Sequence, residues 1–140
     1  MIKETTQKSI PVFPNCFVCG QENTKGLQRE FTLYDKKSET KFTGTKIHLG
    51  YENMVHGGII SALLDDAIVW ASYASTGLFG VTAELNIRFL KPIPINQEFT
   101  IKGEILEDKG KLWIGRGTIE NDNGDVYAAA KARIIPLNKF

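Results

Sequence analysis

The residues best suited to chemistry lie in one short stretch, where two glycines follow a histidine and two aspartates come soon after. The stretch reads His56-Gly57-Gly58-Ile59-Ile60-Ser61-Ala62-Leu63-Leu64-Asp65-Asp66. If a helix begins at the glycines, its first amides have no intrahelical acceptor and carry the positive end of the helix dipole. Glycine leaves those amides open to close approach. Such a helix start can bind a carbonyl oxygen and stabilise the charge that forms on it during nucleophilic attack.

Asp65 is the candidate to activate the nucleophile. It lies eight residues after Gly57, a little over two helical turns along, and on the same side as Ser61. Asp66 is a rival for this role, because it points to a helix face about 100° away. Ordinary explanations exist for each feature: paired glycines often make an entry turn, aspartate pairs often lie on a solvated helix face, and a histidine often caps a helix.

One amphipathic helix over residues 59–74 would carry these groups. Apolar residues recur there at three- and four-residue spacing, which is the pattern of a helix with one apolar face. No glycine or proline interrupts the pattern before Gly77. The apolar positions are Ile60, Leu63, Leu64, Ala67, Ala71 and Ala74.

Six further segments alternate apolar and polar residues as β-strands do. The predicted strands cover residues 27–34, 40–47, 81–89, 99–105, 112–119 and 126–135. Asn123-Gly124 is the sharpest hairpin signal, and short connections predict an antiparallel meander of the last four strands. Only the long helix can cover the apolar face of this sheet. We therefore expect an α+β hot-dog fold, in which a curved antiparallel sheet (β-β-α-β-β-β-β) is wrapped round one long central helix.

Length and composition fit one globular domain over residues 1–140, with a flexible or extended tail over residues 1–15. The 140 residues are 42% hydrophobic and carry a net charge of +1. The sequence has no basic stripe, which argues against nucleic acid as a partner. No stretch of about eighteen apolar residues could span a membrane. Met1–Phe13 has no apolar run of the kind that secretory signal peptides need. We expect a cytoplasmic protein with no membrane partner.

Three motifs follow one another along the chain. Residues 55–65 read Val-His-Gly-Gly-x-x-x-x-Leu-Leu-Asp, and residues 84–92 read Glu-Leu-Asn-Ile-Arg-Phe-Leu-Lys-Pro. Before both lies Cys-Phe-Val-Cys-Gly over residues 16–20, with Asn23 and Gly26-Leu27. Together these motifs resemble the PaaI-type acyl-CoA thioesterases of the hot-dog superfamily, over roughly residues 16–135. The resemblance implies hydrolysis of an acyl-CoA, or of another acyl thioester such as one on a carrier protein, with no cofactor.

The resemblance also implies the roles of the site residues. Asp65 would be the general base or the nucleophile, and the Gly57 N–H would bind the thioester oxygen. His56 would orient the site, and Thr82 would lie near the attacking water. The residues expected to contact the substrate are Gly58, Asn53, Ser61 and Asp66. Many relatives carry an asparagine about seven residues before the glycine, where this chain has Gly50, and Asn53 is the candidate to replace it.

A homodimer or homotetramer with shared sites is expected from the same resemblance, with Gly57 of one subunit facing Asp65 of the other. The strand over residues 81–89 supports this, because it is predicted to end at a sheet edge. An apolar edge strand is an aggregation hazard unless it is paired, and pairing with its own copy about a twofold axis removes the hazard. Its predicted outer face, away from the helix, holds Thr82, Glu84, Asn86 and Arg88.

The two cysteines, Cys16 and Cys19, could bind zinc together with His48 and His56. The histidines are eight residues apart, which does not match the ligand spacing of zinc fingers. We therefore expect no metal, and a packing role for the cysteines.

Alternative functions are a hot-dog hydratase or dehydratase and a non-catalytic acyl-thioester-binding protein. The hydratase pattern has a histidine five residues after the aspartate, where this chain has Trp70. The intact spacing from Gly57 to Asp65 argues against a purely binding role. Four apolar residues late in the helix and beyond it are core candidates that could instead line an acyl tunnel: Trp70, Tyr73, Leu78 and Phe79.

Overall fold

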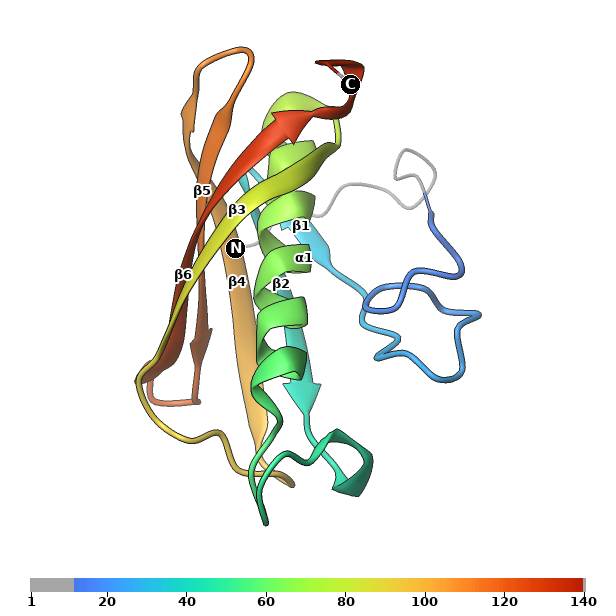
Figure 1. Ribbon diagram of the computed structural model, residues 1–140, viewed down its shortest axis with the longest axis vertical. Coiled ribbons are helices and arrows are strands. Elements are labelled where there is room, and N and C mark those ends of the chain that lie inside the picture. Colours follow the sequence, from blue (N-terminus) through green and yellow to red (C-terminus); the bar gives the residue numbers. More distant parts are fainter. Residues whose placement is uncertain (1–11, 140) are drawn as a thin grey trace.

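A six-stranded sheet curves round one long helix in the computed structural model, which describes residues 12–139 (Figure 1). The predicted tail over residues 1–15 falls mostly outside the described residues. The described helices include none with the length and apolarity that a membrane crossing needs. In chain order the elements are β1 (Thr32–Tyr34), β2 (Lys37–Thr43), η2 (Lys46–His48), α1 (Gly57–Thr76), β3 (Gly80–Phe89), β4 (Glu98–Asp108), β5 (Trp113–Glu120), β6 (Val126–Pro136) and η3 (Leu137–Lys139).

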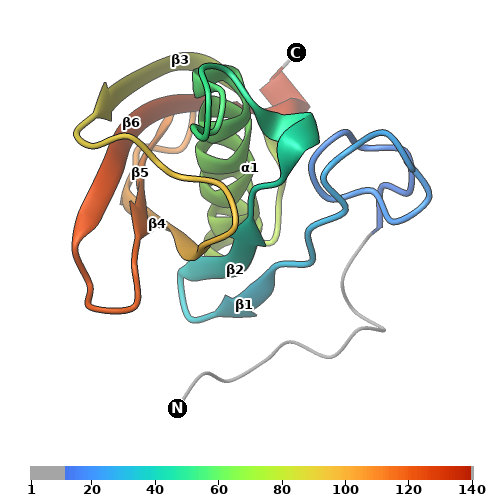
Figure 2. The same cartoon turned by 90° about the horizontal axis from the view of Figure 1, so that it is seen from below.

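The strand order of the sheet is β1-β2-β4-β5-β6-β3, and every pairing is antiparallel. This confirms the α+β hot-dog fold. The predicted four-strand meander is wrong at one strand, because β3 pairs with β6 and not with β4. The connection over residues 90–97 does not form a hairpin, since it carries Pro92 and Pro94. It passes across the start of α1 (Figure 2), where the Val55 N–H donates to the Ile93 carbonyl oxygen at 2.8 Å.

The apolar face of α1 lies against the inner face of the sheet. Its contact with β4 is so close that a side-chain methyl on Gly103 would lie 2.3 Å from the Ala67 carbonyl oxygen, so only glycine fits there. The Ser38 hydroxyl of β2 donates to the same carbonyl oxygen at 2.5 Å. Each buried leucine or isoleucine contributes about 1.5–3 kcal/mol, and together they fix the helix on the sheet. The apolar residues of α1 that are fully enclosed are Leu63, Leu64, Ala67, Ile68 and Ala71.

The first predicted strand, over residues 27–34, is wrong over its first half. The Leu27 N–H donates to the Phe17 carbonyl oxygen and the Arg29 N–H to the Val18 carbonyl oxygen, so this backbone bonds to the preceding loop instead of the sheet. Strand β1 is consequently only three residues long.

The second predicted strand, over residues 40–47, begins earlier and ends earlier in the structure. Strand β2 spans Lys37–Thr43, because the turn between β1 and β2 is short and centres on Asp35, whose φ is 51°. After β2, a capping box at Thr45 starts the short helix η2 and ends the extended backbone.

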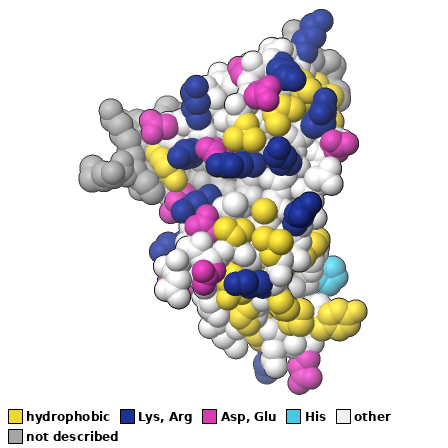
Figure 3. Space-filling model, turned by 90° about the vertical axis from the view of Figure 1, so that its left-hand side faces the viewer, with side chains coloured by type: hydrophobic (Ala, Val, Ile, Leu, Met, Phe, Trp, Pro, Cys, Tyr) yellow, Lys and Arg dark blue, Asp and Glu magenta, His cyan; other side chains and the backbone are white. Residues whose placement is uncertain are grey.

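The outer face of the sheet carries many charged side chains. Lys and Arg side chains lie among Asp and Glu over its upper part, whereas hydrophobic side chains gather over its lower part (Figure 3). Neighbouring strands form the ion pairs Lys41–Glu98, Lys102–Glu120 and Arg116–Glu104. Charged outer and apolar inner faces explain why the helix packs on only one side of the sheet.

Candidate active site

The start of α1 holds one backbone amide that no other described group uses. His56 is the N-cap residue, and its Nδ1 accepts a hydrogen bond from the Gly58 N–H at 2.8 Å. The N–H groups of Ile59 and Ile60 donate to the His56 carbonyl oxygen. Within residues 12–139, the Gly57 N–H has no acceptor. It is therefore a free donor at the positive end of the helix dipole.

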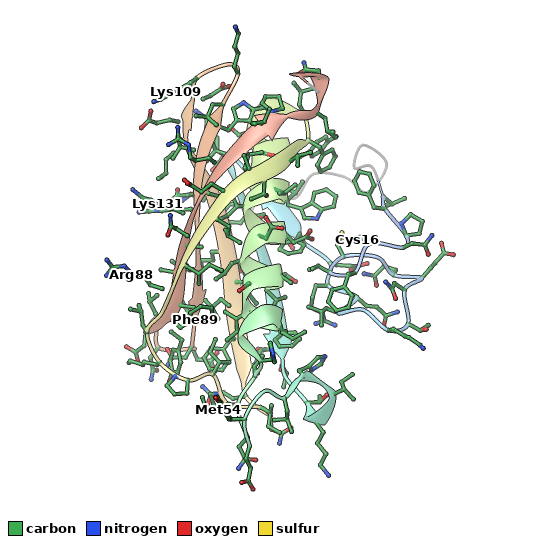
Figure 4. All side chains as sticks on the ribbon, in the orientation of Figure 1. Cys16, Met54, Arg88, Phe89, Lys109 and Lys131 are labelled. Atoms are coloured by element: carbon green, nitrogen blue, oxygen red, sulfur yellow. The ribbon has the colours of Figure 1, made fainter. Side chains whose placement is uncertain are left out.

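An apolar groove opens beside this amide. Its volume is about 550 Å³ and its walls include Tyr51, Met54, Ile60, Phe89 and Leu90. A methyl group on Gly57 would lie 3.5 Å from the Phe89 ring. Figure 4 shows Phe89 on the helix side of β3, whereas its neighbour Arg88 points away from the sheet. An unpaired donor beside apolar walls can make a strong hydrogen bond to a developing negative charge once a bound ligand excludes water from the groove.

Asp65, near the middle of α1, is hydrogen-bonded to Thr82 of β3. The Thr82 hydroxyl donates to Asp65 Oδ1 at 2.5 Å, and both side chains are half-buried. The bond leaves Asp65 Oδ2 available for another partner. Helix and strand thus bring together two residues that the sequence resemblance had assigned to one site.

Thr82 reaches the helix because β3 contains a bulge. The pairing with β6 shifts between Thr82 and Glu84, so that Ala83 is an extra residue in β3. The expectation that Thr82 shares the outer face with Glu84 and Arg88 is therefore wrong, because a bulge reverses the alternation of side chains at that point. Without the bulge, Asp65 would have no hydroxyl partner from this strand.

Ser61 is on the same side of α1 as Asp65, one turn before it. Its hydroxyl donates back to the Gly57 carbonyl oxygen at 2.7 Å. This bond occupies the hydroxyl hydrogen within the helix, while the oxygen can still accept a hydrogen bond from a ligand.

Asp66 faces a different region, the loop that precedes β1. Burial raises the pKa of the Asp66 carboxyl to about 6; the Cys19 thiol and the Trp70 indole lower it in part, and the charge of Asp65 adds to the rise. Burial also raises the pKa of the Cys19 thiol, and the charge of Asp66 adds to that rise. Asp66 does not line the groove at the helix start, so the structure separates it from Gly57.

The two histidines do not join the cysteines. Within the described residues, the one group of potential metal ligands combines Cys16, Cys19 and Asp66, whose ligand atoms all lie within 4.8 Å of one another. His48 packs edge-on against Phe42 with ring centroids 5.0 Å apart, and its Nδ1 accepts a hydrogen bond from the Thr45 N–H. The partner of the cysteines is Asp66, which the sequence had suggested as a rival catalytic base and as a substrate contact.

The loop before the helix places Asn53 and Gly50 differently. Asn53 has a φ of 60°, its carbonyl oxygen accepts from the Ile95 N–H, and the residue is not part of the groove wall. Gly50 does line the groove, and a methyl group there would lie 3.1 Å from His56 Cα. A larger residue at position 50 would therefore push against the helix cap. The idea that Asn53 replaces an asparagine at position 50 stays a prediction.

Gly57 and Asp65 do not meet within one chain. Eight residues of α-helix separate them by about 12 Å, and Asp65 does not line the groove beside Gly57. On one side β3 pairs with β6, and its other edge is free within the described sheet. The two groups with the clearest chemistry thus lie at separate points along the helix.

The far end of α1 holds aromatic residues packed on one another. The Tyr73 and Phe79 rings stack with centroids 4.6 Å apart, and Trp70 contacts the edge of Phe79 at 5.2 Å. Phe13 closes this cluster from the N-terminal loop. Leu78 is exposed. These residues cover the helix end remote from the groove, which fits the expected core role better than a tunnel lining.

Sequence reasoning did not identify Phe89 and Leu90 as groove residues. Phe89 was assigned to the apolar positions of the predicted strand over residues 81–89, and Leu90 was named only within the motif over residues 84–92, yet the two are 56% and 52% exposed. The available signal was Pro92 soon after them, because a proline cannot continue the hydrogen bonding of a central strand and therefore marks the end of the strand at these residues.

The sequence profile of the thioesterase superfamily matches residues 52–128, which are more than half of the chain. Acyl-coenzyme A thioesterase THEM4 of Mus musculus is 28% identical over 120 residues, or 81% of this chain and 51% of THEM4. The chain thus spans about half the length of this curated relative.

Solved structures agree with the fold. A crystal structure of a thioesterase superfamily protein has a TM-score of 0.79 and 26% identity, covering 91% of this chain and 63% of that chain. A hypothetical thioesterase from Streptococcus pneumoniae TIGR4, solved with coenzyme A, has a TM-score of 0.70 and 26% identity, covering 77% of this chain and 84% of that chain.

Proposed function

The chain belongs to the thioesterase superfamily, and we propose that it is a PaaI-type enzyme that hydrolyses an acyl-CoA to the free acid and the thiol. The observation that carries the proposal is the free Gly57 N–H at the start of α1, beside an apolar groove. Hydrolysis of a thioester needs a donor of this kind, because negative charge develops on the carbonyl oxygen in the transition state.

Coenzyme A is the preferred thiol carrier. The Streptococcus pneumoniae relative was solved with coenzyme A, and the mouse relative is named as an acyl-coenzyme A thioesterase. Lys91 at the groove wall adds a positive charge that could approach the phosphates of the carrier. A thioester on a carrier protein is the alternative for the same groove. A cytoplasmic location stays a prediction from the sequence.

Asp65 acts on the carbonyl carbon in one of two ways. As a general base, its carboxylate takes a proton from water while the water oxygen forms a bond to the carbonyl carbon. As a nucleophile, its own oxygen forms that bond, and water later cleaves the resulting anhydride. In both cases the C–S bond breaks, the sulfur leaves and takes up a proton, and the Gly57 N–H holds the oxygen while it is charged. Thr82 orients Asp65 through the hydrogen bond to Oδ1.

A complete site requires two chains in this proposal. Gly57 and Asp65 are about 12 Å apart along one helix, too far to act on one carbonyl group. Strand β3 has a free edge with exposed apolar residues at both ends, Val81 and Phe89. Pairing of two such edges about a twofold axis would bring the Gly57 of one subunit to the Asp65 of the other. The assembly would be a homodimer, or a homotetramer built from two dimers.

The direct test is thiol release from acyl-CoA esters of increasing chain length and from phenylacetyl-CoA, followed with a thiol reagent. We expect turnover of at least one ester by the wild type and a loss of turnover in Asp65→Asn. Tight binding of an ester without any thiol release would contradict hydrolysis and identify the chain as a binding protein. Conversion of an unsaturated acyl-CoA without thiol release would identify a hydratase.

A further inference from the structure

Local hydrogen bonds fix the conformation of the loop that carries the thiols of Cys16 and Cys19. The Cys19 N–H donates to Cys16 Sγ at 3.4 Å, and the Gly20 N–H donates to the Cys16 carbonyl oxygen at 3.0 Å. A methyl group on Gly20 would lie 2.5 Å from three backbone atoms, so only glycine allows this turn. The N–H···S bond fixes the position of the Cys16 sulfur relative to the backbone of Cys19.

Buried residues anchor this loop on the protein. Val18 and Leu27 are each 6% exposed and belong to the apolar core. Backbone hydrogen bonds from Leu27 to Phe17 and from Arg29 to Val18 close the loop across its base. In Figure 4, Cys16 lies on the part of the loop that faces α1. The positions of both sulfurs relative to the helix are therefore set by packing.

Asp66 completes the group from the helix side. Three potential ligand atoms lie within 4.8 Å of one another, one each from Cys16, Cys19 and Asp66. Asp66 Oδ2 is fully enclosed, and no group in the described part of the chain satisfies it with a hydrogen bond. A buried carboxylate oxygen without a partner is costly. A cation held between the carboxylate and the two sulfurs would satisfy it.

We propose that Cys16, Cys19 and Asp66 form a zinc site that fastens the N-terminal loop to α1. Two sulfurs and a carboxylate oxygen are a donor set that Zn²⁺ accepts, with a fourth position for water. Zn–S bonds of about 2.3 Å in a tetrahedral site place two sulfurs roughly 3.8 Å apart, a spacing the cluster accommodates. Asp66 is turned about 100° round the helix from Asp65, and none of the three residues lines the groove beside Gly57, so we assign the site a structural role.

This proposal replaces the sequence-based expectation of no metal. That expectation considered histidines as partners for the cysteines, and both histidines lie elsewhere. A disulfide between Cys16 and Cys19 is the competing arrangement, but it would leave Asp66 Oδ2 without a partner. Zinc accounts for all three residues together.

The test is metal analysis of untagged protein purified under reducing conditions without chelator. We expect about one zinc per chain, and about one equivalent of Co²⁺ bound after removal of the zinc, with a thiolate-to-cobalt charge-transfer band. Cys16→Ser, Cys19→Ser and Asp66→Asn should each lose most of the metal. Asp65→Asn is the matched control, because it removes the neighbouring carboxylate and should retain the zinc.

Co²⁺ titration of the chelator-treated wild type keeps the test valid if a variant fails to fold. Reduced wild-type protein that binds neither zinc nor Co²⁺ would overturn the proposal. So would a Cys16–Cys19 disulfide in protein purified without reductant, if reduction then restored no metal binding. Retention of zinc by Asp66→Asn at wild-type affinity would exclude Asp66 as a ligand and contradict the site as proposed.

Discussion

The adjacent carboxylates of Asp65 and Asp66 have different surroundings on helix α1. Asp65 is held by the Thr82 hydroxyl of an edge strand, near the free edge of the sheet. Asp66 is turned about 100° further round the helix, lies under the cysteine loop and has an enclosed oxygen. One carboxylate is oriented but accessible, and the other is enclosed by a loop. The comparison shows that two neighbouring aspartates on one helix can have different surroundings because their side chains point in different directions, and our two proposals assign them different roles.

The largest expected effect is the difference in kcat between variants of Asp65 and of Asp66. Asp65→Asn keeps the shape of the side chain and removes the base, so kcat should fall by about 10² or more. Asp66→Asn should leave kcat close to the wild-type value. Steady-state thiol release by both folded variants measures the difference, and the opposite ranking would move the catalytic role to Asp66.

Gly57→Pro tests the free amide at the helix start. Proline has no N–H and is well tolerated at the first helical position, and His56 has the φ of −60° and ψ of 137° that suit a residue before proline. We expect kcat to fall by about 10² with little loss of stability. Gly57→Ala is the control, since it retains the N–H and its methyl group meets the Phe89 ring at an ordinary 3.5 Å. Equal activity of the two variants would exclude the amide as the oxyanion donor.

Thr82→Val tests the bond that orients Asp65. Loss of a hydrogen bond to a charged group costs about 1.5–3 kcal/mol, so kcat should fall by roughly tenfold to a hundredfold while KM changes little. Thr82→Ser retains the hydroxyl and should restore most of the rate. A Thr82→Val variant with wild-type kcat would show that Asp65 does not depend on the hydrogen bond from Thr82.

The smallest effect on activity is expected on the Asp66 side. Cys16→Ser combined with Cys19→Ser should keep kcat near the wild-type value while the free energy of unfolding falls by about 1–3 kcal/mol. Thermal unfolding and thiol release on the same preparation measure both quantities. A loss of activity as large as that of Asp65→Asn, in a folded variant, would connect the cysteine loop to catalysis and remove the contrast between the two sides.

The sequence predicted the helix and the number of strands well, because both depend on local periodicity. The predicted helix over residues 59–74 lies within the observed Gly57–Thr76. The position of β3 beside β6 was not predictable in the same way, since pairing depends on the path of the chain between strands. The bulge at Ala83 also escaped prediction, as its residues show ordinary alternation.

The candidate site was predictable in part. The helix start and Asp65 followed from residue types and spacing, and the place of Thr82 came from the family resemblance. The contact of Asp66 with Cys16 and Cys19 could not be predicted, because it joins residues far apart in the chain through a loop with no regular pattern.

The central claim is that one subunit supplies Gly57 and the other supplies Asp65. The most direct measurement mixes the inactive variants Gly57→Pro and Asp65→Asn under conditions that allow subunits to exchange. Half of the resulting dimers would be hybrids with one intact site, so we predict recovery of about a quarter of the wild-type activity. Hybrid dimers that form and remain inactive, or a wild-type protein that is monomeric and fully active at assay concentration, would contradict the claim.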